Sequence, residues 1–158
     1  MKLQLAEIND LKYVNDLYIS VRNTPFCVWN EYYPTNEEIE CDYTAKTLYI
    51  TKEDDSILGA VSVNPENEMN DLNCFTKVFK TCEIARVVVN PIYQNKKIGQ
   101  FMINELIKEL NKKGYNSIRL AVEVNHIPAI KLYEKCGFKK VGTHFMYEHH
   151  YYLYELLL

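Results

Sequence analysis

Glycine, proline and long apolar runs are scarce in this sequence. Of its 158 residues only five are glycine and five are proline, while 47% are hydrophobic and 13% are aromatic. This composition excludes a collagen-like or disordered chain and supplies enough apolar surface for a core. The length predicts one domain spanning residues 1–158, since domains commonly run to about 100–150 residues. No apolar stretch approaches the roughly 18 residues of a membrane span, and the first ten residues do not resemble a signal peptide, so we expect no membrane partner.

Paired cysteines and an excess of basic residues are also missing. The five cysteines are odd in number and form no CxxC pair, so the ligand spacing of zinc and redox sites is absent and a reducing cytoplasm is indicated. They are Cys27, Cys41, Cys74, Cys82 and Cys136. Lysine and arginine number 18 against 21 aspartates and glutamates, which is unlike the basic balance of a general nucleic-acid binder. We therefore expect a cytoplasmic protein that uses no metal and binds no nucleic acid.

β-rich segments recur along the chain and predict a sheet. They are rich in Val, Ile, Leu, Tyr and Thr, and they cover residues 3–8, 47–52, 57–63, 82–89, 118–124, 138–143 and 146–157. The polar turn 53–56 joins the second and third segments as a hairpin, and residues 64–80 are expected to form a long connection. The last two segments are expected to close the sheet as an antiparallel hairpin, which favours a mixed sheet over a purely parallel one.

Helical spacing of apolar residues predicts four helices between these strands. They cover about residues 10–21, 35–46, 98–113 and 126–136. Thr35 and Glu38 form a capping box at the start of the second helix, and Gly114 and Gly137 lie where the third and fourth helices must end. The order strand, polar turn, helix therefore occurs twice in the second half of the chain.

The first of these units contains the segment VVVNPIYQNKKIGQ, residues 87–100. Free backbone N–H groups at a helix N-terminus, together with the positive end of the helix dipole, favour a phosphate. Gly99 would let a ligand approach the backbone closely, and Lys96 and Lys97 add two cations beside the turn. A phosphate site is one interpretation, and a plain helix start with solvated lysines is the other. The spacing matches neither a Walker loop nor a GxGxxG motif.

The second unit ends in NHIPAIKLYEKCGF, residues 125–138. Both segments resemble motifs of the GNAT superfamily of acyl-CoA-dependent N-acyltransferases, V-x-P-x-x-Q/R-x-x-G-x-G/A and N-x-x-A-x-x-L-Y-x-x-x-G-F. Every specified position from Ala129 to Phe138 matches the second motif, and the resemblance covers about residues 82–143. Two positions depart from the motifs. Lys97 replaces the first motif's leading glycine, and His126 replaces the second motif's asparagine, with Asn125 one residue early.

The resemblance implies a GNAT-like α/β fold. Its central sheet is mixed, mostly antiparallel and flanked by helices, and it splays open between the strands near 82–89 and 118–124. The cosubstrate implied is acetyl-CoA, with no metal, and its pantetheine arm would hydrogen-bond the strand at Val87, Val88 and Val89. Its pyrophosphate would be held by the N–H groups of Gln94, Asn95, Lys96, Lys97, Ile98, Gly99 and Gln100. Asn125 is interpreted as a helix cap first, with a cofactor contact left open.

The activity implied is an N-acetyltransferase in which a primary amine attacks acetyl-CoA directly in a ternary complex. A backbone amide near Val87 would polarise the thioester carbonyl. Glu83 is the candidate base, and strand alternation predicts that it shares a face with Ala85 and Val87; a structural carboxylate at a strand entrance is the alternative. Tyr133 matches the family tyrosine that protonates the leaving thiolate, and a packing tyrosine is the alternative.

The acceptor is expected to be an amine-bearing small molecule or peptide. In the family, the first two helices, their loop and the C-terminal hairpin form the wall of the acceptor cleft. Between residues 23 and 45 there are five acids and no lysine or arginine, namely Glu31, Glu37, Glu38, Glu40 and Asp42. They would suit a cationic amine, or they form the solvated face of the second helix. A catalytically silent acyl-CoA-binding or sensing domain, a nucleotide-binding regulatory module and a homodimer all stay open.

Overall fold

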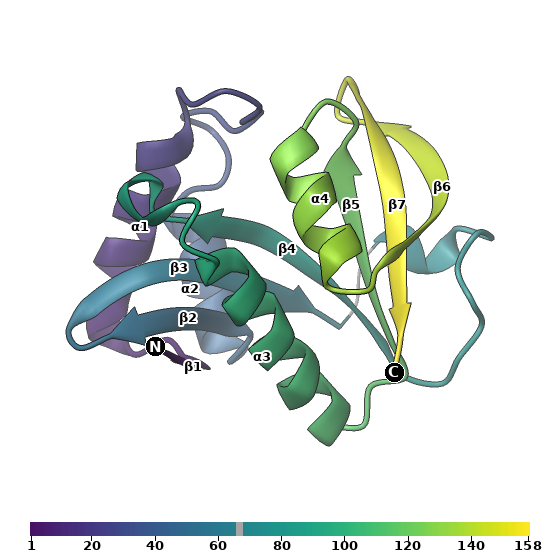
Figure 1. The fold of residues 1–158 in the computed structure, drawn as a ribbon, viewed down its shortest axis with the longest axis horizontal. Coiled ribbons are helices and arrows are strands. Elements are labelled where there is room, and N and C mark those ends of the chain that lie inside the picture. Colours follow the sequence, from purple (N-terminus) through teal and green to yellow (C-terminus); the bar gives the residue numbers. More distant parts are fainter. Residues whose placement is uncertain (66–67) are drawn as a thin grey trace.

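Seven strands form one mixed sheet in the order β1-β2-β3-β4-β5-β7-β6, and helices cover both of its faces (Figure 1). The computed structural model describes residues 1–65 and 68–158. The strands are β1 (Lys2–Leu5), β2 (Leu48–Glu53), β3 (Ser56–Asn64), β4 (Thr81–Val89), β5 (Ser117–Glu123), β6 (Lys139–Met146) and β7 (His149–Leu157). The predicted strands are therefore confirmed, with two exceptions at their ends: the first strand ends at Leu5, so that Ile8 lies in a short 3-10 helix, and Met146 ends β6 instead of beginning the last strand.

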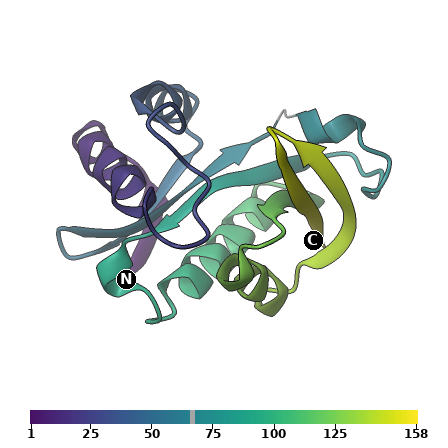
Figure 2. The same cartoon turned by 90° about the horizontal axis from the view of Figure 1, so that it is seen from above.

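The four predicted helices are also present. They are α1 (Leu11–Val21), α2 (Asn36–Thr44), α3 (Ile98–Lys112) and α4 (Ile127–Lys135). Figure 2 shows α1 and α2 on one face of the sheet and α3 and α4 on the other. The predicted capping box starts α2, because the Thr35 hydroxyl accepts from the Glu37 N–H and the Glu38 carboxylate accepts from the Thr35 N–H at 2.7 Å. No helix among the described residues is long and apolar enough to cross a membrane.

Three short 3-10 helices complete the described structure: Ile8–Asp10, Glu68–Asp71 and Pro91–Tyr93. The second lies in the predicted long connection between β3 and β4, of which residues 66 and 67 fall outside the described residues. The third leads from β4 toward α3. It therefore belongs to the turn that was predicted to hold a phosphate.

β4 and β5 run parallel, and the other neighbouring strands run antiparallel. Only three residue pairs join β4 to β5, between Thr81–Glu83 and Ser117–Arg119, although the two strands have nine and seven residues. Beyond these pairs the strands diverge, as Figure 1 shows. The predicted splay of the sheet at this position is confirmed.

β4 also contains a β-bulge. Two of its residues, Arg86 and Val87, lie opposite the single residue Val61 of β3, where the register shifts. Arg86 has a left-handed φ of 50°. An extra residue of this kind shifts the inward and outward alternation of a strand by one position.

The bulge changes which face each β4 side chain occupies. Cys82 and Ile84 are buried in the core beneath α3, and Val87 packs against the same core. Glu83, between Cys82 and Ile84, therefore points to the opposite face, which α1 and α2 cover. The prediction that Glu83 shares a face with Val87 is wrong, because alternation was counted through the bulge as if β4 were regular.

Candidate active site

The turn between β4 and α3 presents backbone N–H groups at the start of α3. Asn95 and Lys97 both have left-handed backbone conformations, with φ of 63° and 62°, and such conformations gather neighbouring N–H groups into an anion-binding concavity. The side chains of residues 94–97 are exposed. The turn is therefore open to an anion, and the macrodipole of the fifteen-residue α3 favours negative charge at this end.

Lys97 occupies the N-cap position of α3. Its φ of 62° is the conformation that glycine adopts readily and other residues adopt at a cost of about 1–2 kcal/mol. The lysine therefore keeps the backbone shape expected of the family glycine. Its side chain is exposed and adds a cation beside the turn.

The side chain that Gly99 lacks would meet protein. A Cβ atom at Gly99 would lie 3.2 Å from Leu132 Cδ2 on α4 and 3.6 Å from Val89 Cγ2 on β4. Close packing of the first turn of α3 against α4 therefore accounts for glycine at this position. Contact between the Gly99 N–H and a phosphate stays a prediction.

Val87, Val88 and Val89 lie in the part of β4 that has separated from β5. On the other edge this part of the strand stays paired with β3. The edge that faces the splay therefore has backbone N–H and C=O groups without a β5 partner. This is the arrangement that a pantetheine arm would need in order to hydrogen-bond the strand, and that contact stays a prediction.

Tyr133 comes from α4 and lies in the core beneath α3, with 7% of its surface exposed. Its ring makes an edge contact with Phe138, with ring centroids 5.9 Å apart. Burial raises the pKa of the Tyr133 hydroxyl, so the hydroxyl stays protonated at neutral pH. The residue thus packs in the core, and its protonation state suits a proton donor.

The turn before α4 differs from the predicted one. His126 is the cap of α4, because its Nδ1 accepts from the Ala129 N–H at 3.3 Å, and burial lowers the pKa of this imidazole and favours the neutral form that can accept. Asn125 donates its N–H and its side-chain amide to the Glu123 carboxylate at 2.8 and 3.0 Å. The prediction that Asn125 caps the helix is wrong, because these bonds tie it back to the end of β5.

Glu83 lies where the splay begins. It is the last β4 residue that pairs with β5, opposite Arg119, and it faces Asn64 of β3. Its side chain is half-buried. It therefore lies at the closed end of the splay, on the face of α1 and α2, while Tyr133 lies on the other face.

The acids between residues 23 and 45 do not form one surface. Asp42 is buried and forms an ion pair with Arg86 of the β4 bulge, with 2.7 Å between Arg86 Nη2 and Asp42 Oδ2. Glu38 is engaged in the cap of α2. Both the interpretation of Asp42 as part of a solvated helix face and its use for a cationic amine are therefore wrong, because its charge is already paired.

The loop between α1 and α2 extends toward α4. The Phe26 ring lies 5.8 Å from the His126 ring, so the loop reaches the first turn of α4. The same loop carries Tyr33, whose hydroxyl accepts from Arg86 Nη1 at 3.0 Å. Sequence reasoning missed this link; the signal for it was a single arginine in the apolar run CEIARVVV.

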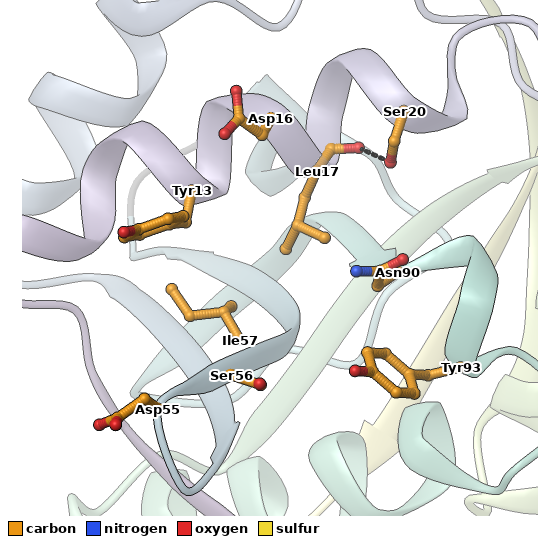
Figure 3. A pocket seen from close by; sticks show the side chains of 9 residues that line it. All are labelled: Tyr13, Asp16, Leu17, Ser20, Asp55, Ser56, Ile57, Asn90 and Tyr93. Carbon is orange, nitrogen blue, oxygen red and sulfur yellow. Dashed lines mark hydrogen bonds between the residues drawn. The ribbon is translucent and has the colours of Figure 1, made fainter.

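A groove of about 380 Å³ lies beside this site, between α1 and the β2–β3 turn (Figure 3). Asn90 and Tyr93 of the turn after β4 contribute to its lining, together with Asp16 and Asp55. Two carboxylates would repel a phosphate. The groove is therefore not an extension of the predicted pyrophosphate site.

No group of three His, Cys, Asp or Glu side chains within residues 1–65 and 68–158 is placed to hold a metal ion. The turn before α3 and the free edge of β4 lie along the splay, Glu83 lies at its closed end, and Tyr133 lies in the core beneath α3. The binding of an anion by the turn and the transfer of protons by Tyr133 and Glu83 stay predictions.

The sequence model of the acetyltransferase (GNAT) family matches residues 14–138 of this chain. The chain therefore belongs to the acetyltransferase (GNAT) family, and the family resemblance inferred from its motifs is confirmed.

Two individual relatives match this chain over only part of its length. An uncharacterised N-acetyltransferase of Schizosaccharomyces pombe is 30% identical over 98 residues, which are 62% of this chain and 54% of that protein. The ribosomal protein bS18 alanine N-acetyltransferase of Escherichia coli is 33% identical over 63 residues, 40% of this chain and 43% of that protein. The matches thus span about half the length of these relatives.

The fold agrees with that of a solved structure. The structure of yncA from Salmonella typhimurium with its cofactor acetyl-CoA has a TM-score of 0.78 and 18% identity, and the match covers 99% of this chain and 93% of that one. At this identity the likeness concerns the fold. It supports the mixed, mostly antiparallel sheet flanked by helices as a fold that the two chains share.

Proposed function

We propose that this protein is an N-acetyltransferase that transfers the acetyl group of acetyl-CoA to a primary amine by direct attack in a ternary complex. The observation that carries the proposal is the splay between β4 and β5. The turn proposed to bind the pyrophosphate follows the free end of β4, and Glu83 and Tyr133 lie on opposite faces of the sheet. Family membership supports the same reaction class.

Acetyl-CoA would be held mainly by backbone groups. The N–H groups of the seven residues from Gln94 to Gln100 would receive the pyrophosphate, and Val87, Val88 and Val89 would hydrogen-bond the pantetheine arm. The left-handed Asn95 and Lys97 support this role, because they shape the turn for an anion. A contact from Asn125 is a further proposal, since its amide is shared with Glu123.

Two side chains are assigned to the proton transfers of this reaction. An alkylammonium with a pKa of roughly 10 must lose a proton before it attacks, and Glu83 or a water that it holds would accept that proton. The amine nitrogen then bonds to the carbonyl carbon, which a backbone N–H near Val87 polarises. As the C–S bond breaks, the thiolate takes a proton from the Tyr133 hydroxyl, which burial keeps protonated at neutral pH. The attacking nitrogen loses its second proton to solvent water as the amide forms, and the Tyr133 phenolate regains a proton from solvent.

The acceptor proposed is an amine-bearing small molecule or peptide. The name of the Escherichia coli relative states that it acetylates an alanine of a ribosomal protein, which supports including a peptide α-amine among the candidates. The exposed acids of the acceptor side are Glu31, Glu37 and Glu40. They favour a cationic acceptor less than the full set of five would, because Asp42 and Glu38 are engaged within the protein.

The test measures amine-dependent release of CoA from acetyl-CoA with three probes: an alanine-initiated peptide, a lysine peptide with a blocked N-terminus and a small aliphatic diamine. We expect release with at least one amine above the rate without amine. Calorimetry with acetyl-CoA and with ATP accompanies it. Binding of acetyl-CoA without release for any amine would favour the silent acyl-CoA-binding domain, and binding of ATP instead would favour the nucleotide module.

A further inference from the structure

Arg86 and Asp42 form a buried ion pair between the β4 bulge and α2, which we call the bulge ion pair. Arg86 Nη2 donates to Asp42 Oδ1 at 2.9 Å and to Oδ2 at 2.7 Å, and Nε donates to Oδ2 at 3.1 Å. The two side chains are only 10% and 9% exposed. Two donors of one guanidinium on one carboxylate fix the orientation of both groups as well as their distance.

Two further hydrogen bonds extend the bulge ion pair to neighbouring elements. The Ser62 hydroxyl of β3 donates to Asp42 Oδ2 at 2.6 Å, and Arg86 Nη1 donates to the Tyr33 hydroxyl at 3.0 Å. The guanidinium therefore connects β4, α2 and the loop between α1 and α2. An ion pair this buried is favourable only when further hydrogen bonds satisfy its remaining donors and acceptors, and these two bonds contribute to that.

The backbone at Arg86 needs such support. Its φ of 50° is a left-handed conformation that a residue with a side chain adopts at a cost. The peptide that follows carries the N–H of Val87, the group near which the thioester carbonyl is proposed to bind. The direction of that N–H depends on the conformation at Arg86, so the side-chain contacts of Arg86 hold it.

The same guanidinium also reaches the acceptor side. Tyr33 is 44% exposed and belongs to the loop that forms part of the acceptor wall in the family. Its hydroxyl is fixed by Arg86 Nη1. The Arg86 side chain therefore connects the proposed acceptor wall to the β4 bulge.

We propose that Arg86 is a positioning residue that orients the N–H of Val87 toward the thioester and holds Tyr33 in the acceptor wall. This inference rests on the proposed N-acetyltransferase function. A brace that only attaches α2 to the sheet is the competing explanation. In a folded Arg86 variant, the positioning role predicts altered affinities for acetyl-CoA and the amine, whereas a brace predicts unchanged affinities.

The first experiment uses Arg86→Lys, which keeps the charge and loses the planar fork. Calorimetry compares CoA with acetyl-CoA, which differ in the acetyl group alone. We expect wild-type protein to bind acetyl-CoA at least threefold more tightly than CoA. We expect the variant to bind CoA within twofold of wild type and to lose the preference for acetyl-CoA.

The second experiment uses Tyr33→Phe, which removes only the hydroxyl that Arg86 holds. With the most active amine of the three probes, we expect the KM for the amine to rise about fivefold, while kcat and the KM for acetyl-CoA stay within twofold. Tyr115→Phe, a half-buried tyrosine just beyond the C-terminal end of α3 and outside the acceptor wall, is the matched control and should change none of these values. Circular dichroism verifies that each variant is folded.

The outcomes separate this proposal from the proposed function. Retained preference for acetyl-CoA in folded Arg86→Lys, or equal binding of CoA and acetyl-CoA by wild type, would overturn the positioning role. An unchanged KM for the amine in Tyr33→Phe would overturn the part of the proposal in which Arg86 holds Tyr33 in the acceptor wall. If wild type prefers acetyl-CoA but releases no CoA with any amine, the proposed transferase function fails while the role of Arg86 at the thioester stands.

Discussion

Removing the carboxylate of Asp42 should destabilise the protein strongly. Asp42→Ala leaves the Arg86 guanidinium buried at 10% exposure without its partner, and breaking a buried pair from one side typically costs about 3–5 kcal/mol. For a chain of 158 residues, each kcal/mol lowers the melting temperature by roughly 2–4 °C. We therefore expect a decrease of about 6–20 °C, measured by thermal denaturation followed by circular dichroism, with urea unfolding as a second measure.

The exposed ion pair of α3 provides a matched control. Lys108 Nζ lies 2.6 Å from Glu105 Oε1, as close as the atoms of the bulge ion pair, but these side chains are 66% and 36% exposed. Glu105→Ala should change stability by about 0.5 kcal/mol or less, because solvent screens the pair. Equal effects of the two substitutions would refute the argument that burial, and not distance, sets the strength of the Asp42 contact.

Four further predictions concern the site. Tyr133→Phe should lower kcat by about 10²–10⁴ with acetyl-CoA affinity within a few-fold in calorimetry, and a wild-type turnover would remove its role as the acid. Glu83→Gln should lower turnover about 10²-fold at neutral pH and recover part of it at higher pH, where free amine is abundant; an unchanged pH profile would return Glu83 to a structural role. Lys97→Glu should weaken CoA binding about tenfold without moving the melting temperature, since only an exposed charge beside the turn is reversed. Burial lowers the pKa of the His126 imidazole in the folded state. The stability that the neutral imidazole contributes is therefore present above its unfolded pKa of about 6.5 and is lost as the pH falls through the folded value. Between pH 7.5 and pH 5, the melting temperature of His126→Asn should therefore decrease less than that of wild type.

Local patterns in the sequence predicted most of the fold. The alternation and spacing of apolar residues located the strands and helices, since burial of one face depends on neighbours within a few positions. The capping box of Thr35 and Glu38 was found for the same reason. The family motifs added the splay, which no local pattern indicates.

Contacts between distant elements could not be predicted in this way. Asp42 and Arg86 are 44 positions apart, and helical spacing alone gave Asp42 the same status as its exposed neighbours on α2. The cap of α4 was missed because Asn125 and His126 are both able to accept a hydrogen bond. Only the position of Glu123, whose carboxylate holds Asn125, decides between them.

The bulge in β4 explains how one strand serves both faces of the sheet. In a regular strand, Glu83 and Val87 are four residues apart and share a face. With Val87 against the core beneath α3, the Glu83 carboxylate would then be buried among apolar side chains, where an unpaired charge is costly. One inserted residue keeps Val87 on the core side and turns Glu83 toward α1 and α2. The left-handed Arg86 that makes this insertion is itself held by Asp42, so the division of the proposed site between two faces depends on an ion pair outside both family motifs.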